Sequence, residues 1–316
     1  IYRRGLSNRY GSYMQTISGI HYNFSLPDIF FSELQKTEAR TRDLQSFKSD
    51  CYFGLIRNFH RFSWFLLYFL GASPVVSKNF LKSENHRLIP MMGNADSFFS
   101  PNATSLRMGD LGYKSQAQDS LEIRYDSIET YISDLRSALA LKYSDYEKIG
   151  VRGIDGEYKQ LNTNLLQIEN EFYSTIRPKR TTERGETPTL ALENRGVEYV
   201  EIRCIDINPF LPCGIEENTV HLWIYFLHIA CLAQVHQLMM MKNIIVIILS
   251  ILVSFFTAVL DLYDNFLLSV LAIVLLITSL ETEGKLELLT TNFFCSSFFS
   301  SKPLLYGKQI LIFPLI

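Results

Sequence analysis

The chain has 316 residues, with 30 basic and 32 acidic side chains, so its formal net charge is −2 and its isoelectric point lies near 6.4. This length is enough for one large domain or two ordinary domains with a packed core. A charge balance so close to neutral gives no electrostatic reason to expect binding to nucleic acid or to an anionic membrane surface, so any partner must be recognised by a local site.

The first predicted strand lies in the segment 15–27, QTISGIHYNFSLP, where apolar and polar residues alternate. Successive side chains of a strand point to opposite faces. The expected core face consists of Ile20, Tyr22, Phe24 and Leu26. The expected opposite face consists of Gln15, Ile17, Gly19, His21, Asn23 and Ser25. An isolated histidine on such a face is more often an exposed or internally hydrogen-bonded residue than a ligand, so the role of His21 depends on the other segments.

Two helices are predicted in the middle of the chain. The aromatic-rich run 51–70 is too long for a strand and stops before Gly71 and Pro74, so we expect a buried amphipathic helix. The run 127–141 has apolar residues at helical spacing, and Ser127 is suited to be its N-cap. The apolar positions of this second helix are Ile128, Tyr131, Ile132, Leu135, Ala138 and Leu139.

Two further strands are predicted, at 165–173 (LLQIENEFY) and at 197–206 (VEYVEIRCID), because apolar and polar residues alternate in both. Between them, the basic run 176–180 (IRPKR) indicates either a solvated loop or a group of cations beside a phosphate. Strands and helices are mixed without strict βαβ alternation. The pattern therefore favours an α+β fold over a doubly wound sheet.

The polar faces of these three strands are candidates to line one bowl. Its residues would be His21, Gln167, Glu169, Glu171, Tyr173, Glu201 and Arg203. Imidazole and carboxylates can hold a divalent cation, and magnesium prefers oxygen ligands together with substrate phosphate. The sequence has neither GxxxxGK[ST] nor GxGxxG, so any ATP would be held through metals and arginines.

The composition changes near Asn218. Most charged side chains precede this position, and the rest of the chain, 219–316, contains no arginine. The runs 243–260 and 265–280 are uncharged and apolar, and each is near the lower limit of about 17–20 residues for a transmembrane helix. The five cysteines are widely separated and form no CxxC pair, which fits a reducing cytoplasm. We expect a cytoplasmic protein, or a membrane-attached one if 243–280 is a genuine hairpin of two helices.

Several motifs, in order along the first 220 residues, resemble the proteobacterial type of glutamate–cysteine ligase, also called γ-glutamylcysteine synthetase. They are YRRGLSNRYGSYMQTISGIHYNFSLP, YFGLIRNFHRF, FLGASPVV, NATSLRMGDLGY, LQIENEFYSTIRPKR and VEYVEIRCIDINPFLPCGI. The resemblance implies a fold similar to that of glutamine synthetase, with a curved antiparallel sheet around the active site and flanking helices.

The same resemblance implies an ATP- and magnesium-dependent ligase. In that family the γ-carboxylate of L-glutamate is joined to the amino group of L-cysteine through γ-glutamyl phosphate, the first step of glutathione biosynthesis. Matched by motif, His21 and Glu201 are implied to bind magnesium, and Arg203 is implied to be the catalytic cation beside the phosphate. The implied cysteine-side pocket consists of Tyr2, Leu6, Gln15, Ile17, Arg107, Tyr113 and Tyr173.

The chain departs from this family at both ends. It opens at Ile1 inside a family motif, so the upstream family strand that carries further metal carboxylates is expected to be absent. After Ile215, the next helix and a glycine-rich loop of the family are missing as well. A metal site without most of its carboxylates would bind magnesium weakly. We therefore expect this N-terminally incomplete chain to be inactive as written.

The codons of the tail indicate why it departs from the family. In a shifted frame, Trp223-Ile224 can read Met-Asp and the segment 228–231 can read Ala-Tyr-Cys, which resembles the missing helix. We interpret 219–316 as the product of a single-nucleotide frameshift near His221 and Leu222, and 1–218 as a partial catalytic domain. The alternative interpretation is a non-catalytic, membrane-attached remnant that retains the cysteine-binding pocket.

Overall fold

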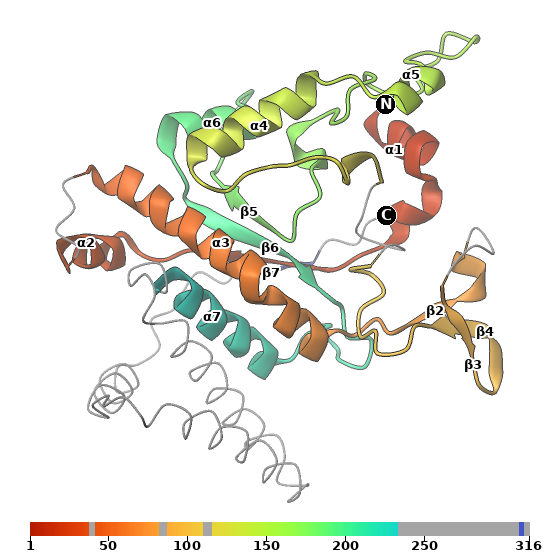
Figure 1. Cartoon of the computed structure of the whole chain (residues 1–316), viewed down its shortest axis with the longest axis horizontal. Coiled ribbons are helices and arrows are strands. Elements are labelled where there is room, and N and C mark those ends of the chain that lie inside the picture. The colour runs from red at the N-terminus through yellow and green to blue at the C-terminus, as the bar shows by residue number, and fades with distance from the viewer. Residues whose placement is uncertain (38–41, 82–86, 110–115, 233–309, 313–316) are drawn as a thin grey trace, which may run out of the picture. The chain divides into compact units, whose positions relative to one another are not determined.

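The computed structural model describes residues 1–37, 42–81, 87–109, 116–232 and 310–312 (Figure 1). The helices are α1 (Tyr2–Tyr10), α2 (Asp28–Thr37), α3 (Leu44–Leu70), α4 (Ile128–Ala140), α5 (Ser144–Ile149), α6 (Pro188–Arg195) and α7 (Glu217–Leu232). The strands are β1 (Ile20–Phe24), β2 (Val75–Ser77), β3 (Ile89–Met91), β4 (Asn94–Phe99), β5 (Ile176–Lys179), β6 (Tyr199–Ile205) and β7 (Ile310–Ile312). Short 3₁₀ helices are η1 (Ser12–Thr16), η2 (Lys78–Phe80), η3 (Gln116–Gln118) and η4 (Glu169–Glu171). Helices and antiparallel strands are mixed along the chain, which confirms the predicted α+β class.

The main sheet has the strand order β5-β6-β1-β7, and each neighbouring pair is antiparallel. Its centre is β6, where Val200, Ile202 and Cys204 are at most 1% exposed and alternate with partly exposed polar residues. On β1, Ile20 and Phe24 are buried on the same side, as the alternation predicted. The sheet therefore has one apolar face and one polar face. A smaller sheet has the order β2-β4-β3.

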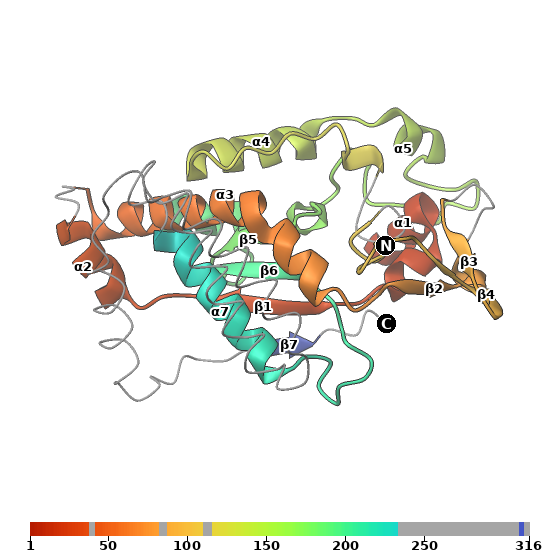
Figure 2. The same cartoon turned by 60° about the horizontal axis from the view of Figure 1, so that its bottom comes forward.

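Helix α3 lies along the main sheet and contacts β5, β6 and α7 (Figures 1 and 2). Its aromatic residues form much of the core, and Phe59 stacks on Trp223 of α7 with ring centroids 5.9 Å apart. The predicted helix 51–70 is confirmed and is longer at its start, because the Asp43 side chain accepts a hydrogen bond from Ser46 N and caps the helix at Leu44. It ends before Gly71, as expected.

Helix α4 has the predicted N-cap. The Ser127 hydroxyl accepts a hydrogen bond from Thr130 N, and the Thr130 hydroxyl accepts one from Ser127 N, so the two residues form a capping box. We expect Ser127→Ala to lower the free energy of unfolding by about 1 kcal/mol, because it leaves a backbone donor of the first turn without its acceptor. Urea denaturation checks this value, and an unchanged midpoint would contradict the importance of the cap.

The structure corrects one predicted strand and excludes one of the two interpretations of the basic run 176–180. The segment 165–173 is not a strand. It contains η4, and polar side chains in it form hydrogen bonds with nearby backbone groups. Gln167 Oε1 accepts from Leu161 N, and Glu171 Oε2 accepts from Gln167 N. The basic run 176–180, in contrast, is not a solvated loop, since its first four residues form β5 and are mostly buried.

The strand around His21 is also shorter than predicted. Gln15 belongs to η1, and Ile17 precedes β1. These two residues therefore do not share the His21 face through strand alternation. The side chain of Gln15 instead donates to the Ser7 hydroxyl and to Arg3 O of α1, and these contacts fix the turn between α1 and β1.

The predicted boundary near Asn218 falls in the first turn of α7. This helix buries one side against α3, and all the described residues belong to one compact unit. The division into 1–218 and 219–316 stays a prediction. None of the described helices is long and apolar enough to cross a membrane, and the runs 243–260 and 265–280 lie outside the described residues.

Candidate active site

The centre of the candidate site is Glu201, on the polar face of β6. Its Oε1 lies 3.3 Å from Nδ1 of His21 on β1. Its Oε2 lies 3.7 Å from Nζ of Lys179 and 3.6 Å from an Nη of Arg203. Arg177 of β5 is the direct ladder partner of Glu201 and is also buried. The sheet therefore places one histidine and three cations around one carboxylate.

The charge of this carboxylate is set by its neighbours. Burial alone would raise the pKa of Glu201, but the hydrogen bond with His21 and the positive charges of Lys179, Arg203 and Arg177 outweigh it and hold the pKa at about 2. Burial lowers the pKa of Lys179, and Glu201 opposes that shift. Glu201 is consequently ionised throughout the neutral pH range.

The oxygen Oε2 of Glu201 is buried, yet it accepts no hydrogen bond from the described residues. Lys179 and Arg203 approach it only at 3.7 and 3.6 Å, beyond hydrogen-bonding distance. A buried charged acceptor without a donor has strong affinity for a cation, so His21 and Glu201 fit two positions of a magnesium site. Among the described residues, no group of three or more His, Cys, Asp and Glu side chains is arranged to hold a metal.

Arg107, predicted to bind a substrate carboxylate, lies at the end of β6. Its Nε donates to Asp206 Oδ1 at 2.6 Å, and an Nη contacts Arg203 O at 3.5 Å. Asp206 is held in turn by the Ser73 hydroxyl at 2.8 Å. The guanidinium packs on Gly19, where a Cβ would come within 2.7 Å of Cζ, so a side chain at position 19 would force the guanidinium to shift. Arg107 is thus firmly oriented beside β1 and β6.

Three of the other predicted pocket residues lie on α1 or directly after η4. Tyr2 and Leu6 are on α1, and the Tyr2 hydroxyl is close enough to Arg177 and Arg203 for their charges to affect its pKa, which burial raises. Tyr173 follows η4, and its backbone N donates to Gln118 Oε1. Tyr113 lies outside the described residues.

A buried ion pair joins these two segments. Arg9 of α1 and Glu171 of η4 have fully buried side chains and are hydrogen-bonded to each other. The Arg9 guanidinium also lies 5.1 Å from the ring centre of Tyr10 and 5.0 Å from that of Tyr146. The pair ties the helix that carries Tyr2 to the segment that carries Tyr173.

Three residues that the sequence analysis assigned to the polar bowl have structural contacts instead. Gln167 and Glu171 are internal structural groups, and Glu169 accepts hydrogen bonds from Thr189 N and Oγ1 at the start of α6. The residues that the sequence analysis missed are Arg177, Lys179 and Asp206. For Arg177 and Lys179 the signal was the basic run IRPKR, because one interpretation of that run was a group of cations beside a phosphate.

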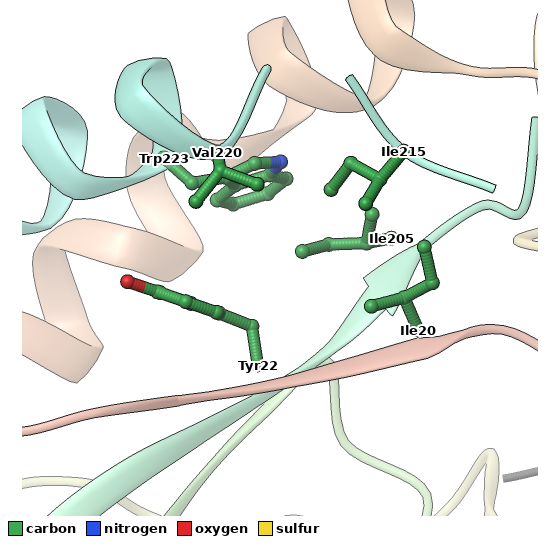
Figure 3. Close-up of a pocket in the computed structure, with 6 residues that line it drawn as sticks. All are labelled: Ile20, Tyr22, Ile205, Ile215, Val220 and Trp223. Carbon is green, nitrogen blue, oxygen red and sulfur yellow. The ribbon is translucent and has the colours of Figure 1, made fainter. Parts of the chain in front are cut away.

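An apolar pocket lies between β1, the end of β6 and the start of α7 (Figure 3). Its lining residues are Ile20, Tyr22, Ile205, Ile215, Val220 and Trp223. Apart from the Tyr22 hydroxyl and the Trp223 indole, these side chains carry no polar group, so the pocket offers little that could orient a charged substrate.

An antiparallel sheet that presents a histidine–glutamate pair and three cations on one face, without a P-loop, suits the binding of an anionic substrate. The family model for glutamate–cysteine ligase matches residues 1–245. The chain belongs to the glutamate–cysteine ligase family.

Curated relatives and solved structures agree with this family. Glutamate–cysteine ligase of Saccharophagus degradans is 53% identical over 220 residues, covering 70% of this chain and 41% of the relative. The Pseudomonas putida KT2440 enzyme is 52% identical over 216 residues, covering 68% and 41%. A crystal structure of glutamate–cysteine ligase from Francisella tularensis in complex with AMP is 43% identical, with a TM-score of 0.66 over 73% of this chain and 44% of that one. The chain therefore spans less than half the length of these relatives.

A bifunctional glutathione synthetase from Pasteurella multocida also resembles the chain, with a TM-score of 0.52, 22% identity, and coverage of 85% of this chain and 33% of that one. At this identity the likeness concerns the fold alone.

Proposed function

We propose that the chain carries the metal-binding and cysteine-binding part of an ATP- and magnesium-dependent ligase that joins the γ-carboxylate of L-glutamate to the amino group of L-cysteine. Family membership supports the reaction. The observation that carries the proposal is Glu201, a buried carboxylate with one oxygen beside His21 and the other without a hydrogen-bond donor, surrounded by cations suited to phosphate.

The chemistry explains why such a site needs both a metal and cations. A carboxylate reacts poorly with an amine, because its negative charge repels the nucleophile and oxide is a poor leaving group. Transfer of the γ-phosphoryl group of ATP to the glutamate γ-carboxylate gives γ-glutamyl phosphate. The cysteine nitrogen then attacks the acyl carbon and expels phosphate. Bound magnesium would supply charge neutralisation for the ATP phosphates during this transfer.

The residues of the chain divide into two groups in this proposal. His21 and Glu201 hold the metal, while Arg203 lies beside them and stabilises the negative charge of the transferred phosphoryl group. Arg107, oriented by Asp206, binds the carboxylate of cysteine. The remaining cysteine-side residues are Tyr2, Leu6, Gln15, Ile17, Tyr113 and Tyr173.

A chimera tests the proposal without depending on the rest of the chain. In it, the 220-residue matched segment of this chain replaces the corresponding part of the Saccharophagus degradans enzyme. We expect phosphate release from ATP that requires magnesium, glutamate and cysteine together. A chimera that unfolds as cooperatively as the parent enzyme but releases no phosphate would contradict the proposal.

Arg107→Lys in this chimera should raise the KM for cysteine much more than the KM for ATP. Lysine keeps the charge but loses the planar guanidinium that can bind a carboxylate through two hydrogen bonds. The loss of one charge-assisted hydrogen bond corresponds to about 1.5–3 kcal/mol, or roughly ten- to hundredfold in KM. Initial-rate titrations of each substrate measure the two effects. A rise in the KM for ATP alone would show that Arg107 belongs to the nucleotide side of the site.

We also propose that the residues after His221 come from a shifted reading frame. Tryptophan is always TGG and methionine always ATG, so reading from the third base of each codon turns Trp223-Ile224 into an obligatory aspartate codon. The same frame turns the segment 239–242, MMMK, into Asp-Asp-Glu and contains no stop codon between 223 and 242 for any synonymous choice. Sequencing the gene across codon 222 tests this, and a frame whose translation does not resemble the ligases would refute it.

A further inference from the structure

Asn23 of β1 lies directly opposite Glu201 in the antiparallel ladder, and Arg177 lies opposite Glu201 on the other side. One rung of the sheet therefore consists of Arg177, Glu201 and Asn23. Directly opposed residues in such a pair have Cβ atoms about 4.5–5.5 Å apart, so their side chains meet on the same face. His21 shares this face, since it reaches Glu201 at 3.3 Å.

Two acceptor oxygens of this rung are buried without a donor among the described residues. They are Oδ1 of Asn23 and Oε2 of Glu201. Buried polar atoms are almost always satisfied, so two acceptors without a hydrogen bond on opposed residues mark a shortage of hydrogen-bond donors at one place. Nζ of Lys179 and an Nη of Arg203 lie 3.7 and 3.6 Å from Glu201 Oε2, too far for a hydrogen bond.

We infer that the amide oxygen of Asn23 is a third protein ligand, with His21 and Glu201, of the divalent cation at this site. The inference rests on the proposed function, which requires that cation. Carboxylate and carbonyl oxygens suit magnesium, and an amide oxygen adds a ligand without adding a charge. Because no group of three His, Cys, Asp and Glu side chains among the described residues is arranged to hold a metal, a third protein ligand from this part of the chain must be a side chain of another kind.

A competing arrangement is that the amide group of Asn23 rotates and donates a hydrogen bond to Glu201. The two arrangements predict different effects of truncation. If Asn23 is a ligand, its truncation lowers the affinity for the cation. If its amide donates a hydrogen bond to Glu201 instead, truncation removes that hydrogen bond, and the affinity for the cation stays equal or rises. Asn23→Ala therefore separates them.

The probe is Mn²⁺, whose free concentration is read by electron spin resonance during titration of the full chain. We expect Asn23→Ala to weaken Mn²⁺ binding about tenfold or more, and Asn23→Asp to restore or tighten it. Glu201→Gln should weaken binding at least as strongly. Asn79→Ala, at an exposed asparagine of η2, is the matched control and should leave binding unchanged.

Each outcome decides the inference. Mn²⁺ binding that is sensitive to Glu201→Gln but equal or tighter in Asn23→Ala overturns the role of Asn23 and leaves the proposed function intact. Absence of Mn²⁺ binding by the unaltered chain, or binding insensitive to Glu201→Gln, overturns the metal assignment of His21 and Glu201 together with that of Asn23. Circular dichroism of each variant confirms that a loss of binding is not a loss of folding.

Discussion

Glu201→Gln in the chimera is expected to lower kcat by about 10²–10³-fold while the fold remains intact. Glutamine has nearly the same size as glutamate but removes the charge that we propose binds the metal, and phosphoryl transfer depends mainly on electrostatic stabilisation. Because the pKa of Glu201 is held at about 2, the wild-type residue is charged at every pH used for the assay. The measurement is kcat at saturating magnesium and substrates.

Thermal unfolding provides the control for this variant. Glu201 compensates the charges of Lys179, Arg177 and Arg203, so its neutralisation will lower the melting temperature to some degree. The activity loss should persist well below that temperature. Near-normal turnover at saturating magnesium would show that Glu201 is not a ligand and that the cations around it serve only the structure of the sheet.

Arg9→Ala should have the largest effect on stability, lowering the free energy of unfolding by about 3–5 kcal/mol. It leaves Glu171 as a fully buried carboxylate without its cation, and such a group costs far more than the pair itself contributes. The change also removes the guanidinium from the rings of Tyr10 and Tyr146. Chemical denaturation of the full chain measures the loss.

The matched control for Arg9→Ala is Arg4→Ala on the same helix. Arg4 forms an ion pair with Glu157 at 2.8 Å, but both side chains are more than half exposed, and such pairs contribute little. Arg4→Ala should therefore change the unfolding free energy by less than about 1 kcal/mol. Equal losses from the two substitutions would contradict the structural role assigned to the buried pair.

The sequence was sufficient to predict elements whose side chains are sorted by burial. In 197–206 the alternation of apolar and polar residues indicates which face of the strand is buried, and in 127–141 the helical spacing of apolar residues does the same for a helix. The structure contains both elements. The same reasoning failed for 165–173. There the apolar residues are buried as an alternating pattern requires, but Gln167 and Glu171 bond to local backbone and to α1, contacts that alternation does not encode.

The candidate site was predictable in part for a similar reason. His21 and Glu201 lie on strands whose alternation was clear, and the structure brings them within 3.3 Å. Arg177 and Lys179 were not assigned, because Pro178 and the flanking charges make β5 look like a loop, although proline is tolerated in a strand at the edge of a sheet. The pairing of Arg107 with Asp206 depends on a long-range approach that no local pattern reveals.

We propose that this chain carries part of the site at which glutamate is activated as an acyl phosphate. Glutamate labelled with oxygen-18 in its γ-carboxylate tests it directly in the chimera, because the attacking oxygen stays on phosphorus when the cysteine nitrogen displaces phosphate. The account predicts inorganic phosphate that carries one labelled oxygen for each dipeptide formed. Unlabelled phosphate released together with the dipeptide would contradict it.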